Sequence, residues 1–229
     1  MSVKVFLDVG SNRGQTVSVV LEPKYGFDRI YCFEPVPELQ QVIAKDYCDP
    51  RIIVNEAGLW NRTCEMPIFS PGSQSGSIFP DKVNVDPRHS VMCKFVRASD
   101  WFREHLTDDD DVYVKLNCEG CEVDIIEDLL DSNEYRKITS LGVAFDVKKI
   151  PSQRGREIKI KRRLEQCGYG NYVDIELHHG DSLREKIQMW LSMAGADRGL
   201  INRIRQIVYC GRTFAARVVR YSRRRLAGG

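Results

Sequence analysis

The sequence predicts a doubly wound α/β fold with a mostly parallel sheet, followed by a basic helical C-terminal extension. Three observations predict it. Short runs rich in β-branched and aromatic residues alternate with helix-compatible segments, the first run ends in a glycine-rich turn, and the second ends in an acid. Strands that alternate with helices are typical of a parallel sheet covered on both faces.

Length and composition are those of an ordinary globular protein. The 229 residues suit one domain with a sizeable core. Hydrophobic residues make up 42% and charged residues 29% of the chain. No apolar run approaches the roughly 18 residues that a membrane-spanning helix needs, and the first residues lack the layout of a signal peptide. We therefore expect a cytoplasmic protein whose eight scattered cysteines are reduced thiols.

The first part of the chain predicts three strands alternating with two helices. The strands are expected over residues 3–9, 29–33 and 51–55, and the helices over residues 14–21 and 37–47. Pro23 follows the first helix, and Pro37 begins the second, where its fixed backbone angle is tolerated. Parallel neighbours need such crossover helices, so these segments predict half of a doubly wound sheet.

The turn after the first strand and the acid after the second predict a nucleotide-like ligand. Gly10, Ser11, Asn12 and Gly14 form the turn. Glycine lets the backbone approach a ligand, and the following helix N-terminus is expected to offer unpaired N–H groups. Glu34 follows Gly14 at about the twenty-residue spacing at which a carboxylate binds ribose hydroxyls. The alternative is an ordinary solvated Glu34.

The segment from residue 60 to residue 100 is less regular. Cys64–Phe69 and Val91–Val96 are predicted strands. Between them, Pro71–Ser77 is a polar, glycine-containing loop. Two interpretations stay open for this loop: a lid over the substrate, or plain surface.

The next part of the chain predicts further strands over residues 112–116, 140–145 and 172–177, with helices over residues 121–130 and 154–166. Asn117, Glu119 and Asp146 follow two of these strands and should lie in the crevice where open α/β sheets bind ligands. Lys115 lies within a strand expected to be buried on both faces, so it requires a partner. These four residues are the candidate catalytic residues. The alternatives are a helix-terminal contact for Glu119 and a simple loop carboxylate for Asp146.

Two further patterns are candidate metal or redox sites. Cys118-Glu-Gly-Cys121 has no second cysteine pair at zinc-finger spacing, which favours two packed thiols. His178 and His179 precede Asp181, and one of them is a candidate base or metal ligand. A surface turn is favoured there, because no third ligand is identifiable. No metal site is predicted.

The C-terminal segment differs from the rest in charge. Residues 198–229 contain nine arginines and no acid. The remaining 25 basic residues face all 32 acidic ones, so residues 1–197 carry a net charge of about −7. Apolar residues recur near helical spacing between the arginines, which predicts a basic amphipathic helix. Such a helix binds an anionic membrane surface or an acidic partner, or docks on its own domain. We divide the chain into residues 1–182 and an extension, residues 183–229.

Several motifs, in the right order, resemble the FkbM-type methyltransferases, a branch of the class I S-adenosylmethionine-dependent enzymes. They are Asp8-Val-Gly-Ser-Asn-Arg-Gly14, Phe33-Glu34-Pro35, Asn55-Glu56-Ala57, Ser75-Gly-Ser77 and Val114-Lys-Leu-Asn-Cys-Glu-Gly-Cys-Glu122. The match spans about residues 3–150. It implies the class I methyltransferase form of the Rossmann-like fold.

The resemblance also implies a cofactor, S-adenosylmethionine, and residues that hold it. Residues 10–14 would cradle its amino-acid end, Glu34 would hold the ribose, and Asn55, Glu56 and Ala57 would flank the adenine. Asp8 and Pro35 belong to the same cofactor-binding motifs. The implied reaction is O-methylation of a sugar or glycan hydroxyl, with a small molecule or a glycan as acceptor.

Two departures from the family pattern affect this reading. Asn117 stands where the family usually has Asp, which removes a carboxylate from the expected active edge. Cys118 and Cys121 replace small apolar residues, which supports the packing interpretation of the pair. Two alternative functions remain open: a catalytically inactive binding protein with a cofactor fold, suggested by Asn117, and a nucleic-acid methyltransferase, suggested by the basic extension.

Overall fold

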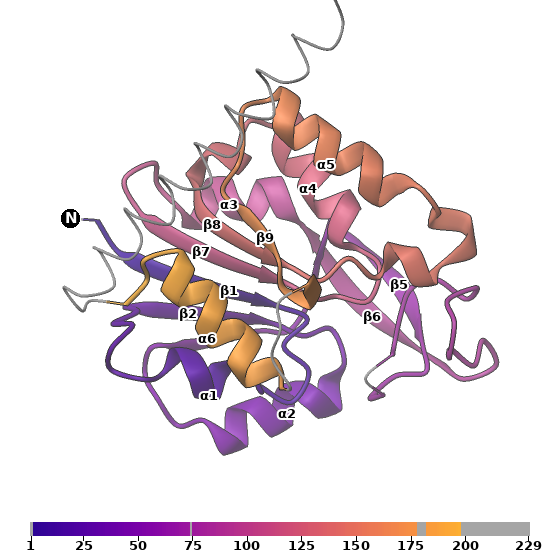
Figure 1. The fold of residues 1–229 in the computed structure, drawn as a ribbon. Coiled ribbons are helices and arrows are strands. Elements are labelled where there is room, and N and C mark those ends of the chain that lie inside the picture. Colours follow the sequence, from indigo (N-terminus) through magenta and orange to yellow (C-terminus); the bar gives the residue numbers. More distant parts are fainter. Residues whose placement is uncertain (1, 74, 178–181, 198–229) are drawn as a thin grey trace, which may run out of the picture.

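The predicted doubly wound fold is confirmed. The computed structural model describes residues 2–73, 75–177 and 182–197. Within these residues the main sheet has six parallel strands in the order β3-β2-β1-β7-β8-β9 (Figure 1). The strands are β1 Lys4–Val9, β2 Arg29–Phe33, β3 Ile52–Asn55, β7 Asp111–Leu116, β8 Ile138–Val143 and β9 Tyr172–Asp174. This is the strand order of a Rossmann-like sheet.

Helices cover both faces of the sheet (Figure 1). They are α1 Val17–Val20, α2 Pro37–Asp46, α3 Ala98–His105, α4 Glu122–Asp131, α5 Arg156–Gln166 and α6 Leu183–Met193. Apolar side chains of α1 and α6 join the core on one face, and those of α3, α4 and α5 join the core on the other. Helix α2 contributes Leu39 to one core and Ile43 to the other, so it packs at the edge of the sheet.

Strand β1 lies in the middle of the main sheet and carries apolar side chains on both faces. Leu7 packs into the core beneath α3 and α4, and Phe6 packs into the core beneath α6. Residues of β1 pair with β2 on one side and with β7 on the other. The order of the strands reverses between β1 and β7, and open α/β sheets bind ligands at such a point, beyond the carboxyl ends of the strands.

A second, smaller sheet packs beside the main one. It consists of β4 Gly58–Trp60, β5 Cys64–Phe69 and β6 Ser90–Arg97 in the order β4-β6-β5. Strands β5 and β6 confirm the two predicted strands of this region. Strand β6 is parallel to β4 and antiparallel to β5. Ile68 and Phe95 place the small sheet against the core of α3 and α4.

Helix α6 packs tightly on the main sheet. Its Trp190 is fully buried, contacts Phe6 at a ring separation of 6.0 Å, and donates a hydrogen bond from Nε1 to Ser140 Oγ at 2.9 Å. A capping box formed by Ser182 and Glu185 begins the helix. The described part of the predicted extension, residues 183–197, is therefore integrated with the sheet. Residues 198–229, with the predicted basic helix, lie outside the described residues, as do His178, His179 and Asp181.

Some element bounds differ from the prediction. The first helix was expected over residues 14–21 but spans only Val17–Val20, because Gly14 has a φ of 78° and the residues before Val17 form turns. Strand β9 ends at Asp174, and a short 3₁₀ helix, Ile175–Leu177, replaces its expected second half. No helix among the described residues is long and apolar enough to span a membrane.

Candidate ligand site at the strand ends

A cavity of about 530 Å³ lies at the carboxyl ends of the central strands. Of the predicted cofactor-binding residues, Gly10, Asn12, Glu34 and Pro35 line it. All the candidate catalytic residues, Lys115, Asn117, Glu119 and Asp146, line it as well. The structure therefore brings the two predicted halves of the site to one cavity.

The other predicted cofactor-binding residues do not line this cavity. Asp8 is buried beneath the glycine turn, Ser11 is buried within the turn, and Gly14 packs against the Tyr47 ring. Asn55 ends β3, Glu56 is exposed, and Ala57 is buried. Their assignment to the cofactor stays a prediction.

The glycine turn brings two backbone segments into direct contact. Gly10 has a φ of 77°, and a Cβ atom at this position would lie 2.0 Å from the Asn117 carbonyl oxygen. The amides of Gly10 and Ser11 both donate to the Phe33 carbonyl oxygen at 3.1 Å. These two N–H groups of the turn are therefore engaged by the fold. The turn shapes the cavity by close approach of the backbone.

Glu34 connects the glycine turn to the end of β2. Its Oε2 accepts a hydrogen bond from the Asn12 amide at 2.8 Å, and its Oε1 accepts one from the Val36 amide at 3.0 Å. Burial raises the pKa of Glu34 to about 7, although the two amide hydrogen bonds oppose this shift. Each carboxylate oxygen has a second lone pair, so the group can still accept a hydrogen bond from a ligand hydroxyl.

Lys115 has the partner that its buried strand position requires. Its Nζ lies 2.9 Å from Asp8 Oδ1 and donates to the Gly10 carbonyl oxygen at 2.8 Å. Both side chains are almost fully buried. Burial raises the pKa of Asp8, while the Lys115 charge opposes that shift. The ammonium supports the glycine turn from below, at the boundary of the cavity.

The turn after β7 holds the second half of the site in an unusual backbone conformation. Glu119 has a φ of 61°, which costs a non-glycine residue free energy, and Gly120 has a φ of 124°. Glu122 Oε1 accepts hydrogen bonds from the amides of Cys118 at 3.0 Å and Gly120 at 3.1 Å. The helix-terminal role considered for Glu119 is thus taken by Glu122, and Glu119 is turned toward the cavity.

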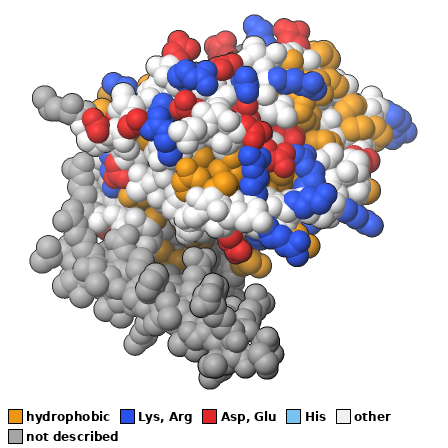
Figure 2. All heavy atoms as spheres, turned by 90° about the horizontal axis from the view of Figure 1, so that it is seen from above, with side chains coloured by type: hydrophobic (Ala, Val, Ile, Leu, Met, Phe, Trp, Pro, Cys, Tyr) orange, Lys and Arg blue, Asp and Glu red, His pale blue; other side chains and the backbone are white. Residues whose placement is uncertain are grey.

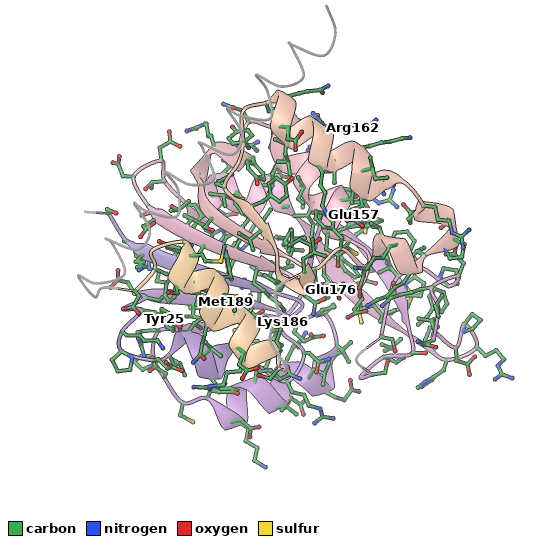
Figure 3. All side chains as sticks on the ribbon, viewed as in Figure 1. Tyr25, Glu157, Arg162, Glu176, Lys186 and Met189 are labelled. Atoms are coloured by element: carbon green, nitrogen blue, oxygen red, sulfur yellow. The ribbon has the colours of Figure 1, made fainter. Side chains whose placement is uncertain are left out.

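Glu119 belongs to a cluster of opposite charges. Lys82 forms an ion pair with Glu119 and lies 3.6 Å from Asp146 Oδ2, and Lys149 lies 2.6 Å from Asp146 Oδ1. Glu176, labelled in Figure 3, follows β9 and pairs with Lys148 at 2.5 Å and Lys149 at 3.8 Å. Each charge in this cluster therefore faces at least one opposite charge.

Glu119 and Asp146 have pKa values that are shifted in opposite directions. Burial, followed by the hydrogen bond and charge of Asp146, raises the pKa of Glu119 to about 8. Burial also disfavours ionisation of Asp146, but hydrogen bonds from Glu119 and Lys149 outweigh it and lower the Asp146 pKa. At neutral pH the pair holds one proton on Glu119 and one negative charge on Asp146. Such a pair can accept a proton from a bound hydroxyl.

Sequence reasoning missed Lys82 and Lys149. Lys82 lies in an irregular segment between β5 and β6, and Lys149 lies in the 3₁₀ helix Asp146–Lys149. Neither segment has a hydrophobic period that would show which way a side chain faces. One signal in the sequence could have pointed to these two lysines. The acids expected at the strand ends require cationic partners if they are buried.

The cavity fits a nucleoside cofactor in size and in chemistry. Its volume lies within the range of about 300–1,000 Å³ that is typical of small-molecule sites. A buried acid, Glu34, faces it from the β2 end, and apolar side chains of Val9, Phe33 and Leu39 line the same part. Glu34 and Asn12 are suited to bind a ribose, and the apolar part is suited to a flat base.

The fold and the cavity define the class: a Rossmann-like α/β protein with a cavity at the switch point of its sheet. No protein-family model matches the chain, and no curated protein matches it in sequence. Among solved structures the chain is similar to that of methyltransferase FkbM from Methylobacillus flagellatus KT, with 18% sequence identity and a TM-score of 0.41. The match covers 62% of this chain and 32% of that chain, so this chain spans about a third of the length of that protein.

Proposed function

We propose that the protein is an S-adenosylmethionine-dependent methyltransferase that methylates a hydroxyl group of a sugar or glycan. One observation carries the proposal: a single cavity contains the Glu34 carboxyl group, suited to a ribose, and the Glu119–Asp146 pair, suited to take up a proton. The Rossmann-like fold supports S-adenosylmethionine as the methyl donor. The resemblance of the sequence motifs to one methyltransferase family supports a sugar or glycan hydroxyl as the acceptor.

On the donor side, Gly10, Asn12, Glu34 and Pro35 would hold the cofactor. When bound, it supplies an electrophilic methyl group on a positively charged sulfur. The protein positions the acceptor oxygen in line with that methyl group, and positioning alone accounts for much of the rate in such reactions. Lys115 and Asp8 fix the turn beneath this half of the site.

On the acceptor side, the hydroxyl must lose a proton during or after the transfer. The Glu119–Asp146 pair carries one negative charge near neutral pH, so it can take that proton. A bound cofactor would supply the methyl group to the acceptor oxygen and would leave as S-adenosylhomocysteine. Asn117, at the end of β7, is suited to orient the acceptor by hydrogen bonding through its amide.

Titration calorimetry with S-adenosylmethionine and S-adenosylhomocysteine tests the donor half. Release of S-adenosylhomocysteine during incubation with a sugar panel tests the transfer. We expect binding and turnover. Absence of binding by the folded chain would contradict every methyltransferase proposal.

Binding without turnover would favour the second candidate, a binding protein that has lost catalysis. Asn117, which replaces the family Asp, motivates this candidate. Restoring the carboxylate with Asn117→Asp discriminates the two. A gain of turnover in that variant would show that the native residue limits the chemistry.

Partners other than the acceptor remain proposals that rest on the arginines of residues 198–229. In the view of Figure 2, basic and acidic side chains are interspersed over the described surface. The described part of this face therefore has no large region of a single charge. We propose a cytoplasmic protein that binds an anionic membrane surface or an acidic partner through its C-terminal segment. Salt-sensitive binding to anionic vesicles, lost on deletion of residues 198–229, tests this. Salt-sensitive RNA binding lost in the same deletion would favour nucleic-acid methylation.

A further inference from the structure

The loop between β5 and β6, described over residues 70–73 and 75–89, forms one wall of the cavity. The Ser70 amide donates to the His89 carbonyl oxygen at 2.8 Å, and the Asp86 amide donates to Ser70 Oγ at 2.7 Å. These bonds bring the ends of the β5–β6 loop together. Ser73, Ser75 and Asn84 line the cavity from this loop.

Hydrogen bonds hold the β5–β6 loop against the strand ends. Ser77 Oγ donates to the Glu119 carbonyl oxygen at 2.6 Å, and the Val83 amide donates to the Lys149 carbonyl oxygen at 3.0 Å. The Ser152 amide donates to Asp81 Oδ2 at 2.8 Å. The loop is therefore attached both to the turn after β7 and to the segment after β8.

Lys82 makes the ionic contact between the loop and the proposed catalytic pair. Its side chain is 1% exposed and contacts Glu119, Asp146 Oδ2 at 3.6 Å and the Ser75 carbonyl oxygen at 3.3 Å. A buried ammonium is costly without partners, and removing one partner from a buried pair is strongly destabilising. Opening the loop would separate Lys82 from both carboxyl groups, so closure of the loop and neutralisation of the pair occur together.

We propose that the β5–β6 loop is the acceptor-side wall of the site and that Lys82 is the positioning residue that closes it, by holding the Glu119 carboxyl group beside Asp146. This rests on the proposed function, because it assigns the acceptor half of the same cavity. In this proposal, opening of the loop admits the acceptor. Its closure then places the acceptor hydroxyl next to the carboxyl pair.

The same wall points to a polyhydroxyl acceptor. The wall offers hydroxyl and amide groups from Ser73, Ser75 and Asn84, which suit sugar hydroxyls.

Three Lys82 measurements test the proposal. In Lys82→Met we expect the amides of residues 75–85 to exchange hydrogen at least tenfold faster, and S-adenosylhomocysteine affinity to stay within twofold of the wild type. Transfer to methyl glucoside should fall at least tenfold in kcat/KM. Lys82→Arg should restore most of the slow hydrogen exchange and most of the kcat/KM, because arginine restores the positive charge. Lys94→Met removes an exposed lysine of the adjacent strand β6 and should change none of these values.

Each contrary result overturns a stated part of the proposal. Unchanged exchange in Lys82→Met would overturn the closing role. An equal loss of S-adenosylhomocysteine affinity would place Lys82 in the donor half. Faster transfer to a monohydroxyl alcohol than to methyl glucoside would overturn the polyhydroxyl acceptor. Absence of cofactor binding by the wild type would contradict the proposed function. The comparison of hydrogen exchange between the wild type and Lys82→Met would still decide whether Lys82 closes the loop.

Discussion

At the residue scale, Glu34 is the side chain whose ionisation should govern cofactor binding. Glu34→Gln removes the negative charge and replaces one acceptor oxygen with a donor, so we expect S-adenosylhomocysteine to bind more weakly by about 1–3 kcal/mol. The Glu34 pKa of about 7 adds a pH dependence. Wild-type affinity should rise as pH increases from about 6 to about 8, because the ionised form accepts hydrogen bonds better. The variant should lack this rise.

Calorimetry at both pH values measures this effect. The exposed Glu38 on α2 gives a matched control, and Glu38→Gln should bind as the wild type does. A folded Glu34→Gln variant with wild-type affinity at both pH values would remove Glu34 from the cofactor site.

Gly10 is the second decisive residue, because it combines a positive φ with direct backbone contact. Gly10→Ala places a Cβ atom 2.0 Å from the Asn117 carbonyl oxygen, so β1 and the turn after β7 would have to separate. We expect a loss of about 3 kcal/mol or more in the free energy of unfolding. Gly155→Ala is the control: its φ is 82°, yet nothing lies within 4 Å of the added atom. Urea unfolding should show a loss of only about 1–2 kcal/mol there. Equal losses would mean that the contact at Gly10 relaxes easily.

At the scale of elements, the sequence predicts the parallel strands of the main sheet better than it predicts the short strands and loops around them. Strands such as β1 and β7 are continuous apolar runs that end in polar residues, and this pattern is characteristic of strands buried on both faces. Their order and their carboxyl ends then place Asn117 and Asp146 in one crevice. Strand β4 escaped prediction because its three residues are too few to show a period.

Contacts between distant segments are the part of the site that local pattern cannot reveal. Lys82 joins Glu119 across 37 positions of the chain. The helix-terminal role weighed for Glu119 belongs to Glu122, because the turn after β7 adopts a left-handed conformation at Glu119 that its residue types do not signal. Packing decides both features, so only the folded chain shows them.

Helix α6 carries a prediction about where the folded domain ends. Trp190 is completely buried against β1 and β8, and Gly142 leaves room for its ring, since a Cβ there would lie 2.6 Å from it. Trp190→Ala should therefore lower the free energy of unfolding by about 3–5 kcal/mol. Met189, the preceding residue on α6, is 38% exposed, and Met189→Ala should cost less than about 0.5 kcal/mol (Figure 3). Urea unfolding of both variants measures the difference. Similar small losses would mean that α6 is dispensable, as a separate extension would be.

At the scale of the whole molecule, three carboxyl groups with raised pKa values should make stability fall as pH rises: Glu34 and Glu119 line the cavity, and Glu122 lies behind the turn after β7. Burial raises the pKa of Glu34 and Glu122 to about 7, and burial with Asp146 raises that of Glu119 to about 8. A carboxyl group whose pKa is higher in the folded state favours folding while it is protonated. Its stabilisation is complete below the unfolded value of about 4.5 and is lost as pH rises through about 7 to 8.

Glu122→Gln isolates one of these groups without disturbing its hydrogen bonds. The amide oxygen of glutamine can still accept from the amides of Cys118 and Gly120, whereas the charge that forms at high pH is removed. The stability of the variant relative to the wild type should therefore increase by on the order of 3 kcal/mol between about pH 5 and about pH 8.5. Urea unfolding at the two pH values measures this change. Glu104→Gln, at an exposed position of α3, should show no such change. If the two variants respond alike to pH, Glu122 is ionised in the folded protein near neutral pH, and the turn after β7 tolerates a buried negative charge.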